Sequence, residues 1–182
     1  MGQALPPEIE RVLVSTAQIA ATVDRLAADL ARDYRGRNPV LVGALTGAVV
    51  LMADLVRRLD FPLTVDFVAV HSYGNQSATS GTVQWRMDLA TDIRDRHVVI
   101  VEDIVDSGVT LHALQATLAE REPASLAICT LLNKASRRRV RVPLGYVGME
   151  IPDEFVVGYG LDFAQQFRHL PYVGVLRREV YA

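Results

Sequence analysis

The pattern of hydrophobic and polar positions near the start of the chain predicts a helix. Apolar residues recur there at spacings of four, three and four, which places them on one face of an amphipathic helix over about 15–34. These residues are Ile19, Val23, Leu26 and Leu30. The segment begins with Ser15-Thr16-Ala17-Gln18, a capping-box pattern, and Gly36 and Pro39 follow its end.

Shorter apolar runs further along the chain predict strands, with helical segments between them. The expected strands span 40–45, 64–70, 83–89, 98–101, 126–132, 147–149 and 155–157, and the expected helices span 48–59 and 111–120. The polar segment 71–82 predicts a mobile loop that joins two strands into a hairpin. Strands that alternate with helices favour an α/β fold with a mostly parallel sheet flanked by helices. Such sheets bind ligands at the carboxyl ends of their strands.

Composition limits the class of protein. Half of the 182 residues are hydrophobic, so we expect a single domain over 1–182 with one substantial core. The formal net charge of −2 favours neither a nucleic-acid partner nor a membrane surface. No apolar run reaches the roughly 18 residues of a membrane span. Residues 1–8 lack the pattern of a signal peptide, so a cytoplasmic location is expected.

Two local features need a separate interpretation. Cys129 is the single cysteine and lies in an apolar run, so it is interpreted as a buried strand residue without a disulfide partner in the chain. The arginine-rich run 137–141 is interpreted as a solvated face, with RNA binding as the alternative.

The segment 98–111 contains the most informative chemistry and reads Val-Val-Ile-Val-Glu-Asp-Ile-Val-Asp-Ser-Gly-Val-Thr-Leu. Glu102 and Asp103 follow four apolar residues of a buried strand, where a carboxylate pair is costly unless a ligand uses it. Sugar hydroxyls and magnesium are natural ligands, because Mg²⁺ prefers a few carboxylates and keeps much of its water.

The turn Asp106-Ser107-Gly108-Val109-Thr110 then opens a helix. Backbone N–H groups at a helix N-terminus attract an anion, Gly108 allows a close approach, and Ser107 and Thr110 add hydroxyl donors. The turn lacks both the Walker lysine spacing and the dinucleotide Gly-x-Gly-x-x-Gly pattern. Carboxylates for hydroxyls beside amides for one phosphate predict a site for ribose 5-phosphate.

The same segment resembles the signature of type I phosphoribosyltransferases, in which four apolar residues precede Glu-Asp-x-x-Asp-Ser/Thr-Gly-x-Thr. More narrowly, the chain is similar to the hypoxanthine-guanine phosphoribosyltransferases over about 44–168. The resemblance implies a flexible lid at about 71–82 and a small hood of strands and loops, with a purine-binding segment at about 147–182. It implies that Asp106 is the acid or base at purine N7. It also implies that Glu102 and Asp103 bind the ribose hydroxyls or the metal.

Two further segments match the parts of that family that hold pyrophosphate. Ala44-Leu45-Thr46-Gly47 resembles the pyrophosphate loop, although Thr46 stands where a lysine is common. The resemblance adds Arg168 as a further pyrophosphate contact. His71-Ser72-Tyr73-Gly74 resembles the start of the lid, with Ser72 and Tyr73 characteristic, and a closed lid would keep water from an oxocarbenium-like transition state.

Two other segments match the parts that hold the base. Leu131-Leu132-Asn133-Lys134 resembles the segment whose lysine bonds purine O6, and a charged donor at Lys134 favours a 6-oxo group over a 6-amino group. Residues 150–162 resemble the segment that places Phe155 against the purine ring and the Val156 backbone at the base edge. The resemblance places Asp162 both at the base and on a second magnesium ion.

The implied reaction transfers the 5-phosphoribosyl group of 5-phosphoribosyl-1-pyrophosphate to hypoxanthine or guanine, giving IMP or GMP and pyrophosphate in purine salvage. The resemblance also implies Mg²⁺ as cofactor and a homodimer or homotetramer. Two alternatives stay open. One is a transferase for xanthine or a pyrimidine, and the other is an RNA-binding regulator on the same fold that uses 137–141 as its contact.

Overall fold

The computed structural model describes residues 5–71 and 84–182. A six-stranded sheet forms its centre, in the order β4-β3-β2-β5-β6-β7. All neighbouring strands are parallel except β4, which runs antiparallel to β3 as the expected hairpin requires. The strands are β2 (Val40–Ala44), β3 (Thr64–His71), β4 (Gln84–Met87), β5 (His97–Val105), β6 (Ser125–Asn133) and β7 (Tyr146–Glu150).

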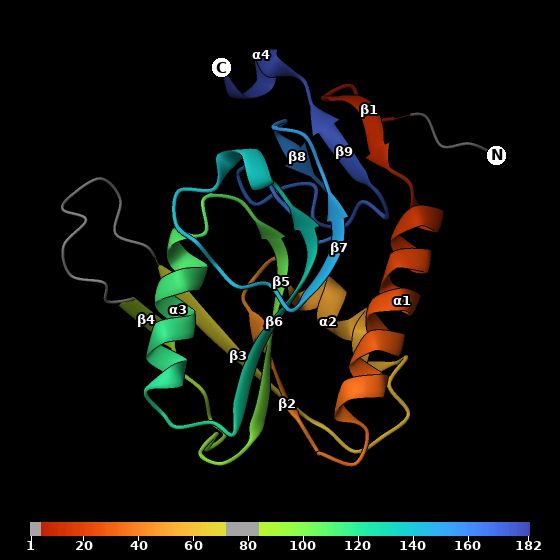
Figure 1. Cartoon of the computed structure of the whole chain (residues 1–182). Coiled ribbons are helices and arrows are strands. Elements are labelled where there is room, and N and C mark those ends of the chain that lie inside the picture. The colour runs from red at the N-terminus through yellow and green to blue at the C-terminus, as the bar shows by residue number, and fades with distance from the viewer. Residues whose placement is uncertain (1–4, 72–83) are drawn as a thin grey trace.

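Helices cover both faces of this sheet, which is why its central strands are mostly apolar (Figure 1). The helices α1 (Thr16–Tyr34) and α2 (Val49–Val56) pack on one face, and α3 (Val109–Ala119) packs on the other. The predicted α/β class is therefore confirmed. The capping box of Ser15 is also present, since the Ser15 N–H donates to Gln18 Oε1 at 2.9 Å and its hydroxyl accepts from the Gln18 N–H.

A small three-stranded sheet lies beyond the carboxyl ends of the main strands, in the order β1-β9-β8 (Figure 1). It combines β1 (Ile9–Val14) from one end of the chain with β8 (Val156–Val157) and β9 (Val173–Leu176) from the other. The hood was expected from about 147 onward, but β7 belongs to the main sheet and β1 joins the small one. A short helix, α4 (Arg178–Tyr181), follows β9.

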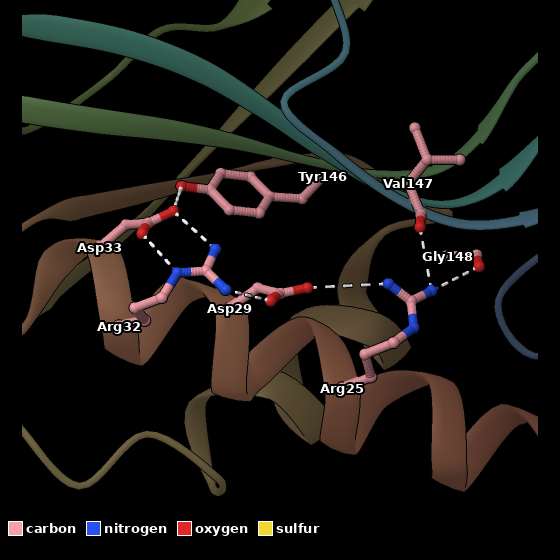
Figure 2. A network of polar contacts seen from close by, with 7 residues as sticks. All are labelled: Arg25, Asp29, Arg32, Asp33, Tyr146, Val147 and Gly148. Carbon is pink, nitrogen blue, oxygen red and sulfur yellow. Dashed lines mark hydrogen bonds and ion pairs between the residues drawn. The ribbon is translucent and has the colours of Figure 1, made fainter.

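A polar network fastens α1 to β7, the edge strand of the main sheet (Figure 2). Arg25 donates to the carbonyl oxygens of Val147 and Gly148 at 3.0 and 2.6 Å. At the other end of the network, the Tyr146 hydroxyl donates to Asp33 at 2.7 Å. Ion pairs along the helix join the two ends, through Arg25–Asp29, Arg32–Asp29 and Arg32–Asp33 at 3.7, 2.8 and 2.9 Å.

Two expected element boundaries differ from the structure around the central motif. The strand expected over 98–101 continues to Val105, because Glu102 pairs with Thr130 and Ile104 with Leu132 of the neighbouring β6. The helix expected from 111 begins at Val109, directly after Gly108 with its φ of 79°. In the described part of the chain, no helix is both long and apolar enough to cross a membrane.

Candidate active site

The acidic pair lies inside β5 rather than after it, and its two members face different neighbours. Glu102 lines a cavity together with residues of the α3 N-terminus. Asp103 is only 6% exposed and lies against the loop before α2, where a Cβ atom on Gly47 would come within 1.8 Å of Asp103 Oδ2. The alternation of a strand therefore directs one carboxylate toward each of two loops.

Burial perturbs the pKa of both carboxyl groups. The pKa of Glu102 is raised well above its ordinary value, by burial first and by the charge of Asp103 second. Burial also raises the pKa of Asp103, although the N–H of Ile104 donates to its carboxylate at 2.8 Å and opposes the rise. Such a pair suits a ligand that supplies positive charge or hydroxyl donors.

The donor set fits magnesium bound together with a substrate. Among the described residues, no three His, Cys, Asp or Glu side chains lie together as a preformed metal site. Mg²⁺ commonly uses only one or two carboxylates and completes its shell with substrate oxygens and water. Glu102 and Asp103 can provide such a partial set.

The predicted pyrophosphate loop packs tightly on its surroundings. The peptide bond between Leu45 and Thr46 is cis, and the Thr46 side chain is exposed. A Cβ atom on Gly160 would lie 2.1 Å from the carbonyl oxygen of Gly47, so the loop also touches the segment after β8. Glycine at both positions is required by these close approaches, because a side chain on Gly47 would collide with Asp103 and one on Gly160 would collide with the loop.

Arg168 joins this region through its guanidinium group. It donates to the Gly160 carbonyl oxygen at 2.7 Å and forms an ion pair with Asp162 at 2.7 Å. Its positive charge also opposes the rise in the pKa of Asp103. The predicted residues Asp162 and Arg168 are thus gathered with Asp103, which is distant from them in the chain, beside the loop.

The predicted phosphate cradle opens onto a cavity of about 260 Å³. Gly108 precedes α3 in the left-handed conformation and no side chain caps the helix, so the first N–H groups of α3 remain available for an anion. The only such bond among the described residues is a long one, 3.4 Å from the Val109 N–H to Ser107 Oγ. The lining includes Leu45, Glu102, Asp106, Gly108 and Thr110, which come from the pyrophosphate loop, β5 and the α3 N-terminus.

A second cavity, of about 390 Å³, adjoins the first. The two cavities share Ile104 and Asp106 in their linings. All four residues that the resemblance assigns to the base line this second cavity, namely Lys134, Phe155, Val156 and Asp162. The structure therefore brings a candidate base pocket and a candidate phosphoribosyl pocket together at Ile104 and Asp106.

Asp106 lies where the two cavities meet, with one oxygen left unsatisfied. Its Oδ1 atom is buried and has no hydrogen-bond partner among the described residues. The Nε atom of Arg137 lies 3.0 Å from this oxygen and forms an ion pair with it outside hydrogen-bond geometry. A buried carboxylate oxygen without a donor is free to accept a proton or a hydrogen bond from a ligand.

Lys134 places a charged donor in the base pocket. The residue follows β6 directly and is 7% exposed, and its backbone N–H donates to the Val105 carbonyl oxygen at 2.9 Å. Burial lowers the pKa of its ammonium group, while the charges of Asp106 and Asp153 act in the opposite direction. The ammonium group makes no hydrogen bond or ion pair within residues 5–71 and 84–182.

Several pocket residues were not found from the sequence. Ile104 lies between Asp103 and Asp106 of the central motif and lines the base pocket. In the sequence it was not distinguished from the other apolar residues of the segment. Asp153, Glu154 and Tyr181 also line the base pocket, and nothing in their local sequence distinguishes them from surface residues. The predicted lid residues Ser72 and Tyr73 lie outside the described residues.

The arginine-rich run 137–141 is only partly the solvated face that its sequence suggested. Arg137 forms ion pairs with Asp106 and Asp153, and Arg138 donates to the side chain of Asn133. Arg139 and Arg141 remain exposed. Part of the run therefore belongs to the wall of the base pocket.

Comparison with known proteins identifies the family of the chain. Residues 13–164 match the phosphoribosyl transferase domain family. The chain belongs to this family. The matched residues include the phosphate cradle, both acidic positions of β5 and the base-pocket residues up to Asp162, so the family covers nearly the whole candidate site.

Several relatives match this chain over nearly their whole length. The chain is 51% identical over 165 residues to a hypoxanthine phosphoribosyltransferase of Salmonella typhimurium, covering 90% of this chain and 93% of the relative. It is 46% identical over 178 residues to a hypoxanthine-guanine phosphoribosyltransferase of Streptococcus pneumoniae, covering 98% and 99%. A solved hypoxanthine phosphoribosyltransferase of Staphylococcus aureus superposes with a TM-score of 0.92 at 42% identity, covering 96% of this chain and 95% of that one.

Proposed function

We propose that this phosphoribosyltransferase-family chain transfers the 5-phosphoribosyl group of 5-phosphoribosyl-1-pyrophosphate to hypoxanthine or guanine, releasing pyrophosphate. The observation that carries the proposal is the pair of adjoining cavities that share Ile104 and Asp106. One cavity has the groups expected for a sugar phosphate and the other has those expected for a flat base. A transferase must bring these two substrates into contact, and the shared wall is where they would meet.

The base pocket supports a 6-oxopurine in particular. Lys134 supplies a buried cationic donor for an exocyclic oxygen, and Phe155 supplies an exposed aromatic face for a planar ring. An amino group in place of the oxygen would meet a second donor, which disfavours adenine. The named relatives act on hypoxanthine or on both hypoxanthine and guanine, which agrees with this choice.

Asp106 is the proposed proton-transfer group at purine N7. Its unpartnered oxygen lies in the lining shared by the two cavities, so a base in the larger cavity can reach it. The amides at the start of α3 would hold the 5′-phosphate, and the loop over 45–47 together with Arg168 would hold pyrophosphate. The negative charge of β5 would stabilise the positive charge that develops on the ribose.

Mg²⁺ is the proposed cofactor. Glu102 and Asp103 would hold Mg²⁺ or the ribose hydroxyls. Asp162 would hold a second ion while its carboxylate also contacts Arg168. When bound, the metal supplies positive charge that neutralises the leaving pyrophosphate. Without it, the acidic pair of β5 would repel that anion.

Product formation from each free base tests the proposal. The purified chain is incubated with phosphoribosyl pyrophosphate, Mg²⁺ and one base at a time, from hypoxanthine, guanine, xanthine, adenine and uracil, and the nucleotides are separated by chromatography. IMP and GMP are expected, with adenine and uracil inactive. Product from xanthine or uracil alone would assign the chain to another base. RNA retention that falls with salt, without turnover of any base, would favour the regulator.

A further inference from the structure

The C-terminal end of the chain supplies an aromatic ring to the base pocket. Tyr181, in the last turn of α4, lines this cavity together with Phe155. The two rings are stacked, with their centroids 4.8 Å apart and an angle of 23° between their planes. Both side chains keep considerable exposure, 37% for Phe155 and 40% for Tyr181, so the pair forms part of the pocket surface rather than of the core.

Backbone contacts fix where this ring lies. The Leu176 N–H donates to the Phe155 carbonyl oxygen at 2.9 Å, which ties the end of β9 to the very residue that the ring covers. Arg177 is then held against the start of β1, since its N–H donates to the Glu8 carbonyl oxygen and its Nε to the Pro7 carbonyl oxygen, each at 2.8 Å. One helical turn from this anchor places Tyr181 over Phe155, and Figure 1 shows α4 beyond the end of β9.

We propose that Tyr181 is a positioning residue for the purine base, whose ring supports the Phe155 ring on the face opposite the bound base. This inference rests on the proposed function. Two rings with centroids 4.8 Å apart are in direct contact, so a base cannot lie between them. In this proposal the base stacks on the other face of Phe155, within the cavity that Ile104 also lines.

The support has a physical reason. Phe155 also meets Phe163 edge-on, with centroids 5.6 Å apart and planes at 87°. Phe163 and Tyr181 therefore both contact the Phe155 ring and together limit its rotation. A preorganised ring loses less conformational freedom when the base binds than a ring free to rotate.

Steady-state kinetics of Tyr181→Ala, Tyr181→Phe and wild type test the role. The KM for hypoxanthine should rise about two- to tenfold in Tyr181→Ala, the range that one aromatic pair contributes. The KM for phosphoribosyl pyrophosphate should stay unchanged. Tyr181→Phe keeps the ring and should behave as wild type. Glu179→Ala, an exposed position in the same helix, is the matched control and should also leave both KM values unchanged.

A double-mutant cycle separates action through Phe155 from direct contact. In a Phe155→Ala background, adding Tyr181→Ala should cause no further rise in the KM for hypoxanthine, because the supported ring is already gone. A full additional rise would show that Tyr181 contacts the base itself and would overturn the positioning role.

The other outcomes are also decisive. An unchanged KM for hypoxanthine in Tyr181→Ala, or an equal rise for both substrates, would reduce Tyr181 to a structural residue. A fall in that KM would show that the tyrosine occupies the place of the base and must be displaced. A wild-type chain that converts neither hypoxanthine nor guanine would overturn the proposed function and this inference together, and wild type alone would reveal it.

Discussion

The α1–β7 network and the candidate active site are both rich in charge, but they treat their charges differently. In the network, two arginines and two aspartates pair with one another, and Tyr146 and two carbonyl oxygens take up the remaining bonds (Figure 2). In the site, Glu102 and Asp103 lie next to each other, and Asp106 keeps a buried oxygen without a donor. The structural network satisfies its charges within the protein, whereas in the site the acidic pair of β5 and one oxygen of Asp106 are left for a ligand.

The pKa shifts follow the same division. Hydrogen bonds from Arg32 and then from Tyr146 lower the pKa of Asp33, so this carboxylate is stabilised in its charged form. Burial and the neighbouring charge raise the pKa of Glu102, so that carboxylate is destabilised in its charged form. Substitutions in the site should therefore change activity more than stability. Substitutions in the network should change stability and leave activity intact.

The largest expected effect is on turnover in Asp106→Asn. An amide cannot exchange a proton with purine N7, so kcat should fall by roughly 10²- to 10⁴-fold, while the KM values for both substrates change little. Asp29→Asn is the matched control in the network and should leave kcat unchanged. Near-normal turnover in Asp106→Asn would remove this residue from the chemistry.

Lys134→Ala should have the next largest effect, and on one substrate only. A hydrogen bond from a charged donor contributes about 1.5–3 kcal/mol, so the KM for hypoxanthine should rise roughly tenfold to a hundredfold. The KM for phosphoribosyl pyrophosphate should stay unchanged. Arg139→Ala, which removes an exposed cation nearby, serves as the control. An equal loss for both substrates would make Lys134 a structural residue.

Glu102→Gln should raise stability while it lowers activity. With a folded pKa above the ordinary value of 4.5, Glu102 reduces the stability of the metal-free protein as pH rises above that value. The variant loses this penalty, so its melting temperature at neutral pH should exceed that of wild type by about 2–4 °C for each kcal/mol removed.

Thermal melts with and without Mg²⁺ complete that experiment. Magnesium should raise the melting temperature of wild type more than that of Glu102→Gln, because only wild type keeps both carboxylates. A Glu102→Gln variant that melts below wild type across the whole pH range would show that the surroundings stabilise the charged form of Glu102. The site and the network would then not differ in how they treat their carboxylates.

The smallest effect is expected for Tyr146→Phe in the network. It removes the hydroxyl that donates to Asp33 and should lower the melting temperature by only about 1–3 °C, since a single hydrogen bond at a partly exposed carboxylate contributes little. Activity should be that of wild type. The difference from wild type should shrink as acid protonates Asp33, whose lowered pKa places the loss at low pH. A clear drop in kcat would link this network to the site.

Elements with local signals were the ones that the sequence predicted best. The helix over 15–34 was predicted from its apolar face and its capping box, and both are properties of adjacent residues. The strand β1 was missed because its burial follows no simple alternation and its partner, β9, lies at the other end of the chain. Irregular register between these two strands weakened the pattern further.

The sequence by itself determined the phosphoribosyl half of the site. Glu102, Asp103, Asp106 and the amides at the start of α3 are contiguous, so the geometry of one strand, turn and helix brings them together. In the base half, Lys134 and Phe155 were assigned from the family resemblance, and only the tertiary structure added Ile104 and Tyr181 and brought the four residues together. Ile104, Lys134, Phe155 and Tyr181 come from four separate segments, and the pairing of β9 with β1 and β8 carries the chain end to the pocket. Contacts between distant segments depend on the packing of the whole chain, and no local pattern in the sequence records them.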